Sequence, residues 1–244
     1  LEVDQSHVRA GAEAEPPQPF VPSRRDMAQG APLLDAKGCA PGFGGQTGTR
    51  VLDYFGQMYR EGLAPRNVVT EGHRKAVEMF ASREVAMITS GMQFLQGIRS
   101  ANPALYRDIG VAPQMSAPHV PPNIAAMNIA VLGSSKEQAL AFRFVRHVTT
   151  AENQTAFAKR VPILPSSRGS YADPFFSHTT GDALLDEARA ISIAQVTSGA
   201  VLVPPMRHYN KLRASYSRGL QTVMLGRKSS VDALAQVDRE WRAL

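Results

Sequence analysis

The chain has 244 residues with a formal charge of +6, and 43% of its residues are hydrophobic and 20% charged. These values are typical of a soluble globular protein, and no apolar run approaches the roughly 18 residues that a membrane span requires. The basic residues are scattered and do not form a stripe with exposed aromatic residues, which argues against nucleic-acid binding.

Metal and disulfide chemistry have little support in the composition. The single Cys39 excludes an internal disulfide and a metal site built from several cysteines. The six histidines show neither HxxxH nor HExxH spacing. We therefore expect no metal and no cofactor.

The N-terminal residues 1–31 differ from the rest of the chain. They are rich in Ala, Pro and charge, with little periodicity, which predicts a poorly ordered lead-in. The first residue is Leu1, which suggests a processed or incomplete product.

Two amphipathic helices are expected next, over about 48–61 and 71–82. The first has apolar residues on one face, namely Val51, Leu52, Phe55, Met58 and Tyr59. Gly62 predicts a C-terminal cap, with Leu63 folding back on the helix.

Three apolar runs predict strands, at 85–89, 109–113 and 124–132. The first ends on Ser90-Gly91 and is followed at once by a helix expected over about 92–100. Strands that alternate with helices indicate an α/β fold. Because about three strong strands is few for this length, any sheet is small or lacks partners outside this chain.

The C-terminal half is expected to be mainly helical. Ser134 with Glu137, and Thr149 with Glu152, have the spacing of a capping box. Three further helix-like segments follow, at about 183–196, 209–225 and 230–241.

No constellation of residues supports catalysis, so no catalytic residue is assigned and we predict that the protein is not an enzyme. There is no G-x-S-x-G elbow, and the glycine-rich run 42–49 lacks the end of a Walker motif. Asp186 and Glu187 are expected on a solvated helix face. An α/β enzyme of hydrolase type with an unrecognised site stays as an alternative, which a buried His near Cys39 or a Ser would favour.

A colinear series of segments carries a family resemblance. In order they read PLLDAKG, YREGLAPRNV, AVEMFASREVAMITSGMQFL, IGVAPQM, MNIAVLGSSKEQALAFRFVRHVTTAENQTAFAK, ILPSSRGSYADPFF, VLVPP and LQTVMLGRKSSVDALAQ. The series, from about residue 31 to the end, resembles the extracellular solute-binding proteins of ABC importers. The similarity is greatest to the large family that binds sugars and related solutes such as glycerol phosphate diesters.

The resemblance implies an α/β fold, the two-lobed clamshell of type II periplasmic binding proteins, with solute between the lobes. By analogy, 32–117 is the first part of the second lobe, 118–170 returns to the first lobe, and 171–244 belongs again to the second lobe. Full members have a large first lobe where this chain has residues 1–31, so most of that lobe is expected to be absent.

The resemblance also implies the function and the partners. It predicts a receptor that binds a carbohydrate, a polyol or a phosphodiester for import and presents it to the permease subunits of an ABC importer. Such a receptor is periplasmic or extracellular, either free or lipid-anchored. A fragment that serves as an interaction module without a solute is a further alternative, which an exposed apolar patch would favour.

The bend after the first expected strand is the leading candidate for the binding site. Ligands sit at the carboxyl edge of open α/β sheets, Gly91 allows close approach to the backbone, and the first helix amides can donate to the solute. Gln93 could hydrogen-bond a polyol, while Met92 or Phe94 could supply an apolar face. The alternatives are that Met92 and Phe94 are helix core and that Gln93 is solvated.

Four more residues complete the predicted set. Asn128 is polar within an apolar run and needs a partner, in the cleft or within the structure. Tyr209 could stack on the solute or hydrogen-bond to it, and Arg207 could pair with an anionic group or lie on the surface. Asn210 is either a cleft residue or a helix cap. We predict that these stretches and the Gly91 bend line one crevice.

Overall fold

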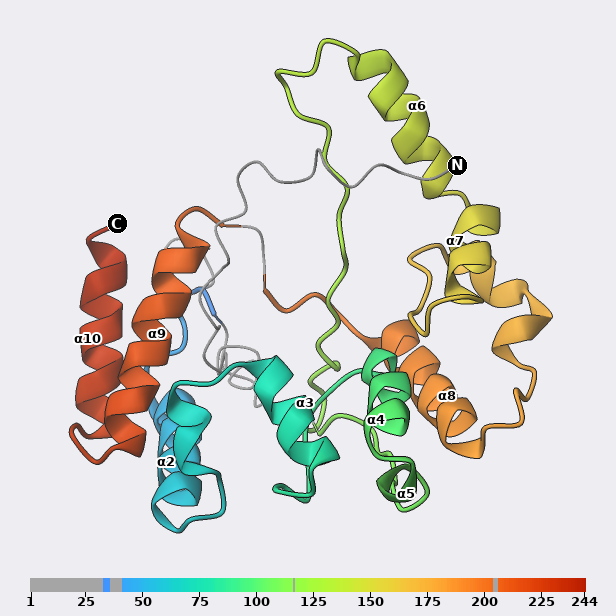
Figure 1. The fold of residues 1–244 in the computed structure, drawn as a ribbon. Coiled ribbons are helices and arrows are strands. Elements are labelled where there is room, and N and C mark those ends of the chain that lie inside the picture. Colours follow the sequence, from blue (N-terminus) through green and yellow to red (C-terminus); the bar gives the residue numbers. More distant parts are fainter. Residues whose placement is uncertain (1–32, 36–40, 116, 204–205) are drawn as a thin grey trace.

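The computed structural model describes residues 33–35, 41–115, 117–203 and 206–244 (Figure 1). The expected lead-in 1–31 and Cys39 lie outside the described residues. The described elements are α2 (Gln46–Arg60), η2 (Arg66–Val69), α3 (His73–Ala81), η3 (Met92–Phe94), α4 (Leu95–Ala101), α5 (Pro103–Tyr106), α6 (Gln138–Val148), α7 (Ala151–Ala158), η4 (Arg168–Ala172), η5 (Pro174–Phe176), α8 (Ala183–Ser198), α9 (Tyr209–Met224) and α10 (Ser230–Arg242).

The largest core lies between α2, α9 and α10, which pack side by side in Figure 1. The apolar face predicted for the first helix is the face that points into this core, and Val51, Leu52, Phe55 and Tyr59 are buried. The Phe43 ring, 1% exposed, packs edge-on against Tyr216 with the ring centroids 5.4 Å apart. Periodicity was sufficient to predict these helices because their burial follows directly from their amphipathic pattern.

A smaller core joins α4 to the N-terminal half of α8. Met92, Leu95 and Ala188 are buried in it. Val111, from one of the expected strands, packs against it without forming a strand. This second core positions the candidate site described below.

The helix α6 stands away from the other helices at the top of Figure 1. It has no buried residue, and its side chains Leu140, Phe142 and Phe144 are 59%, 56% and 62% exposed. The helix is amphipathic in sequence, but within the described residues its apolar face has no covering partner.

The three expected strands are not found among the described residues, which contain only isolated bridges. A strand requires a neighbour that accepts and donates its backbone hydrogen bonds. Within the described residues the amides of 125–131 make no such bond. The prediction of three strands is therefore wrong for this structure, because an apolar run specifies a strand only where a second strand pairs with it.

Two segments that are far apart in sequence run side by side at one such bridge, Asn123 with Ala200. The Ile124 amide donates to the Ala200 carbonyl, and the Ala200 amide donates to the Pro122 carbonyl, both at 3.0 Å. Gly199 is required at this crossing, because an added Cβ would lie 2.6 Å from the Gln195 carbonyl oxygen. The backbones are therefore in direct contact here.

The residues predicted to cap the ends of helices were only partly correct. Gly62 adopts a φ of 76° and caps α2, and the Leu63 amide folds back to donate to the Met58 carbonyl at 2.9 Å, although the Leu63 side chain is 68% exposed. The Ser134–Glu137 capping box is wrong, since Glu137 itself is the N-cap residue of α6 and makes no side-chain cap. The second capping signal is displaced by one residue, because the hydroxyl of Thr150, and not of Thr149, accepts the Asn153 amide.

The longest described helices, α8 and α9, have 16 residues each. None of the described helices combines the length and the hydropathy of a membrane span.

The crossing of the two segments yields a stability prediction. We expect Gly199→Ala to lower the free energy of unfolding by about 1–3 kcal/mol, because the new methyl group overpacks a site bounded by backbone. Gly97→Ala is the matched control, since an added Cβ there meets nothing within 4 Å and Ala favours the helix by up to about 1 kcal/mol. Urea unfolding of both variants measures the difference, and equal midpoints for Gly199→Ala and the parent chain would contradict the packing argument.

The unpaired segment yields a second prediction, on hydrogen exchange. The amides of 125–131 lack backbone acceptors in the described structure, so they should exchange at the rate of an unstructured peptide. The core helix α9 buries seven of its residues and should exchange only through larger opening. Exchange followed by mass spectrometry tests this, and slow exchange across 125–131 in the isolated chain would show that the segment is paired.

Candidate functional site

A cavity of about 250 Å³ lies between α4 and α5, the segment that follows α7, η5 and the start of α8. The lining contains four cationic side chains, three aromatic rings and one carboxylate, and they come from all of these elements. The cations are Arg99, Lys159, Arg160 and Arg189, the rings are Tyr106, Phe175 and Phe176, and the carboxylate is Asp182. The cavity is therefore formed by segments that are far apart in sequence.

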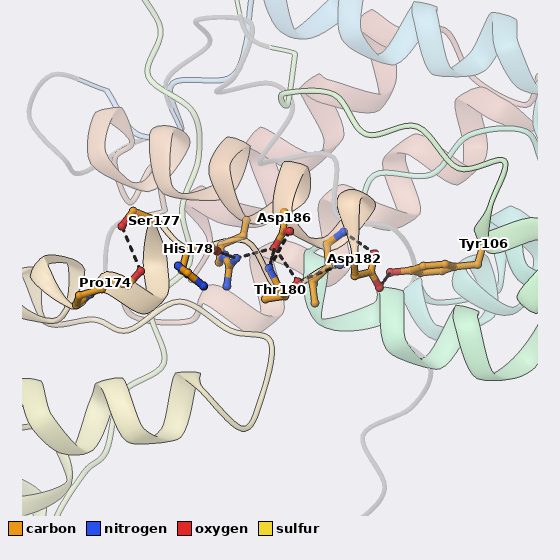
Figure 2. Close-up of polar contacts among 9 residues, drawn as sticks. Tyr106, Pro174, Ser177, His178, Thr180, Asp182 and Asp186 are labelled. Carbon is orange, nitrogen blue, oxygen red and sulfur yellow. Dashed lines mark hydrogen bonds and ion pairs between the residues drawn. The ribbon is translucent and has the colours of Figure 1, made fainter.

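One carboxylate, Asp182, holds several walls of the cavity together (Figure 2). It is the N-cap of α8 and accepts the Leu185 amide at 3.1 Å. The Tyr106 hydroxyl donates to its Oδ2 at 2.9 Å, and Arg99 Nη1 pairs with the same oxygen at 3.1 Å. With its side chain 19% exposed, Asp182 thus ties α4 and α5 to the start of α8.

A second carboxylate, Asp186, organises the loop before α8. Its oxygens accept the Thr180 amide at 3.0 and 2.9 Å, and Oδ1 also accepts the Thr180 hydroxyl at 2.8 Å. Arg189 Nη2 donates to Asp186 Oδ1 at 2.7 Å and to the His178 carbonyl at 2.6 Å. The expectation that Asp186 lies on a solvated face is wrong, because its side chain is 18% exposed and paired with a buried arginine.

The rings of the cavity are held next to cations. The Arg189 guanidinium lies 4.9 Å from the centre of the Phe175 ring, and the Lys159 ammonium lies 5.9 Å from it. Arg99 lies 5.6 Å from the centre of the Tyr106 ring. Such contacts stabilise both partners and restrict the orientation of each ring.

The protonation states follow from these contacts. Burial, together with the hydrogen bond to Asp182, raises the pKa of Tyr106 to about 12, so this hydroxyl stays a donor at neutral pH. The hydrogen bond from the Thr180 side chain lowers the pKa of Asp186. The hydrogen bond from Lys159 lowers the pKa of Asp173. Both carboxylates are therefore ionised and act only as acceptors near pH 7.

The residues predicted at the bend take three different environments. Gly91 is exposed, and the Gln93 side chain lies against it, since a Cβ on Gly91 would meet the Gln93 amide. Phe94 is partly buried and packs edge-on against His73, with the ring centroids 4.9 Å apart. Met92 is buried in the second core and also lines the cavity. Of the eight predicted residues, all of them described, Met92 alone lines it.

The other four predicted residues lie elsewhere. Asn128, Arg207 and Asn210 are exposed, and Tyr209 is partly buried as the first residue of α9. Asn210 does not cap α9, because His208 holds the N-cap position. The described structure shows no hydrogen bond, ion pair or ring contact that joins these residues to the Gly91 bend, and the common crevice stays a prediction.

The cavity residues that sequence reasoning missed had weak signals. Asp182 precedes an apolar helical run, which is the pattern of an N-cap and would have identified its role in α8. Nothing local indicates its partners, since Tyr106 lies 76 residues away and Arg99 lies 83 residues away. The aromatic pair Phe175 and Phe176 belongs to one of the segments that carry the family resemblance, and nothing in that segment predicts a role in a cavity.

The alternative of a hydrolase-type enzyme would be favoured by a buried histidine near Cys39 or a serine. The described histidines are all exposed: His73, His119, His147, His178 and His208. The described residues also contain no group of three or more His, Cys, Asp or Glu side chains that could hold a metal.

Comparison with known protein families gives one match. The family model of the bacterial extracellular solute-binding proteins matches residues 22–181. No curated protein matches the chain.

Solved structures extend the match to most of the chain. A proposed oligosaccharide periplasmic-binding protein from Synechococcus sp. MITs9220 is 29% identical with a TM-score of 0.82, over 90% of this chain and 57% of that one. A second structure of that description, in complex with zinc, is 28% identical with a TM-score of 0.84. The match covers 93% of this chain and 58% of that one. The MalE maltose/maltodextrin-binding domain of Bdellovibrio bacteriovorus, bound to maltotriose, is 18% identical with a TM-score of 0.68. The match covers 93% of this chain and 57% of that domain.

This chain thus spans 57–58% of the length of the Synechococcus structures. The predicted fold class, an α/β clamshell of the type II periplasmic-binding-protein kind, is confirmed by the match to these structures. The family resemblance is confirmed as well, and the chain belongs to the family of bacterial extracellular solute-binding proteins.

Proposed function

We propose that the chain is the solute-binding component of an ABC importer and that its solute is a carbohydrate or a related polyol or phosphodiester. Family membership supports a binding role. Structures of the same fold hold maltotriose in one case and acarbose in another. The proposed receptor works outside the cytoplasmic membrane, free or lipid-anchored, and delivers its solute to permease subunits.

The observation that carries the proposal is the composition of the cavity. Ligand sites are concave, with apolar and aromatic walls and a few placed polar groups. Here Phe175, Phe176 and Tyr106 supply rings, while Gln96, Arg99 and Lys159 supply hydrogen-bonding groups. Rings cover the apolar faces of a sugar, and polar groups replace the water bound to its hydroxyls.

We further propose the lobe division that the resemblance implies. It assigns 32–117 and 171–244 to the second lobe and 118–170 to the first. The cavity lining includes 158–163 from the segment assigned to the first lobe, and Met92, Arg99 and Tyr106 from the second. A solute that contacts both walls would favour the arrangement in which they are close.

The exposed apolar residues of the segment assigned to the first lobe fit this division. Met127 and Leu132 are 82% and 72% exposed, and they precede α6 with its exposed Leu140 and Phe144. We propose that the rest of a first lobe covers this surface, since the Synechococcus relative has a longer chain of which these residues match only part. The same patch favours the second candidate function, an interaction module that binds no solute.

A binding experiment tests the proposed function. We expect at least one saccharide of a panel of small sugars, polyols and phosphodiesters to raise the melting temperature of the 244-residue chain and to give a calorimetric isotherm. Absence of binding by every solute of the panel would contradict it, and would favour the interaction module.

Two glutamine variants locate the site. Gln96 lines the cavity, whereas Gln93 is exposed and lies at the predicted bend outside it. Gln96→Leu should weaken binding by about two- to tenfold, the effect of one lost neutral hydrogen bond, while Gln93→Leu should leave the affinity unchanged. The reverse result would move the site to the Gly91 bend.

A further inference from the structure

The carboxylate of the cavity is already hydrogen-bonded, whereas several N–H groups of its cationic side chains are free. We propose that its solute is a saccharide that carries an anionic group, such as a carboxylate or a phosphate. This inference rests on the proposed function and specifies the solute class of the same site.

The carboxylates around the cavity already have donors. Asp182 receives the Leu185 amide, the Tyr106 hydroxyl and Arg99. Asp173 receives the Phe175 amide at 2.9 Å and Lys159 at 2.8 Å. Asp186, described above, is engaged by the Thr180 amide and hydroxyl and by Arg189. Asp182, the carboxylate of the lining, is therefore already engaged by three donors, and the two carboxylates just outside the lining are paired as well.

The donors of the cavity are in excess. A guanidinium has five N–H groups and an ammonium has three, and Arg99 and Lys159 each use one in an ion pair. Within the described part of the chain, the Arg160 side chain has no hydrogen-bond or ion-pair partner, and it is exposed at the cavity. The charged groups of the lining that are free to contact a solute are thus N–H donors.

The net charge of the lining is positive, which also favours an anionic solute. Its charged residues are four cations, Arg99, Lys159, Arg160 and Arg189, against the one carboxylate Asp182. Counting Asp173 and Asp186 as well leaves the cations in excess. A concave site with one excess sign of charge attracts solutes of the opposite sign. Hydrogen bonds from Arg or Lys to a carboxylate or phosphate are also stronger than those to a neutral hydroxyl.

The size of the cavity limits the solute. A volume of about 250 Å³ is below the range of roughly 300–1,000 Å³ that is usual for ligand pockets. The cavity therefore suits a small saccharide and not a long oligosaccharide.

The test is calorimetry of the 244-residue chain with glucuronate, glucose 6-phosphate, glucose and inorganic phosphate. We expect the two acidic sugars to bind about tenfold more tightly than glucose, and the preference to fall as salt is raised. Arg160→Gln should reduce the preference, and circular dichroism should be unchanged because this side chain is exposed. Arg143→Gln, a change of an exposed arginine on α6, is the matched control and should have no effect.

The possible failures are distinguishable. Glucose binding as tightly as the acidic sugars, with no dependence on salt, would overturn this inference and leave the proposed function intact. Inorganic phosphate binding as tightly as glucose 6-phosphate would overturn the saccharide part of the inference. Absence of binding by all saccharides would overturn the inference, and the polyols and phosphodiesters of the wider panel would then decide the proposed function. An unchanged preference in Arg160→Gln would overturn the role of the unpaired cation.

Discussion

The cavity depends on the Asp182 carboxylate. As an N-cap it satisfies an amide at the start of α8, and its remaining oxygen receives donors from α4 and α5. A half-buried charge is tolerated when it is paired and hydrogen-bonded, so each partner supports the others. Loss of any one would leave the carboxylate under-paired, which couples the geometry of three helices to a single side chain.

The parts of the described structure differ in how much they depend on distant contacts. The helices α2, α9 and α10 form a core from their own amphipathic faces. The cavity walls are held by polar contacts between distant segments, such as the pairing of Arg99 with Asp182. Apolar packing is not directional, whereas charged hydrogen bonds fix atoms in place, and a binding site needs the second kind of contact.

The same difference explains what could be predicted from the sequence. The helices that became α2, α8, α9 and α10 were predicted because their signals are local. The strand at 124–132 was predicted wrongly because an apolar run does not reveal whether a paired neighbour exists. Met92 was placed near the site because it directly follows the Ser90-Gly91 bend. Tyr106 and Asp182 were missed, since no local pattern joins residues 76 positions apart.

The unpartnered surface of α6 takes no part in the polar contacts that hold the cavity. None of the polar contacts that fix Asp182, Asp186 and Arg189 involves 124–148. Covering α6 would therefore leave the contacts of these carboxylates unchanged. Because the charged side chains of the lining lie outside α6, their excess of donors does not depend on what packs against that helix. The proposed preference for an anionic solute therefore depends on the residues of the lining and not on α6.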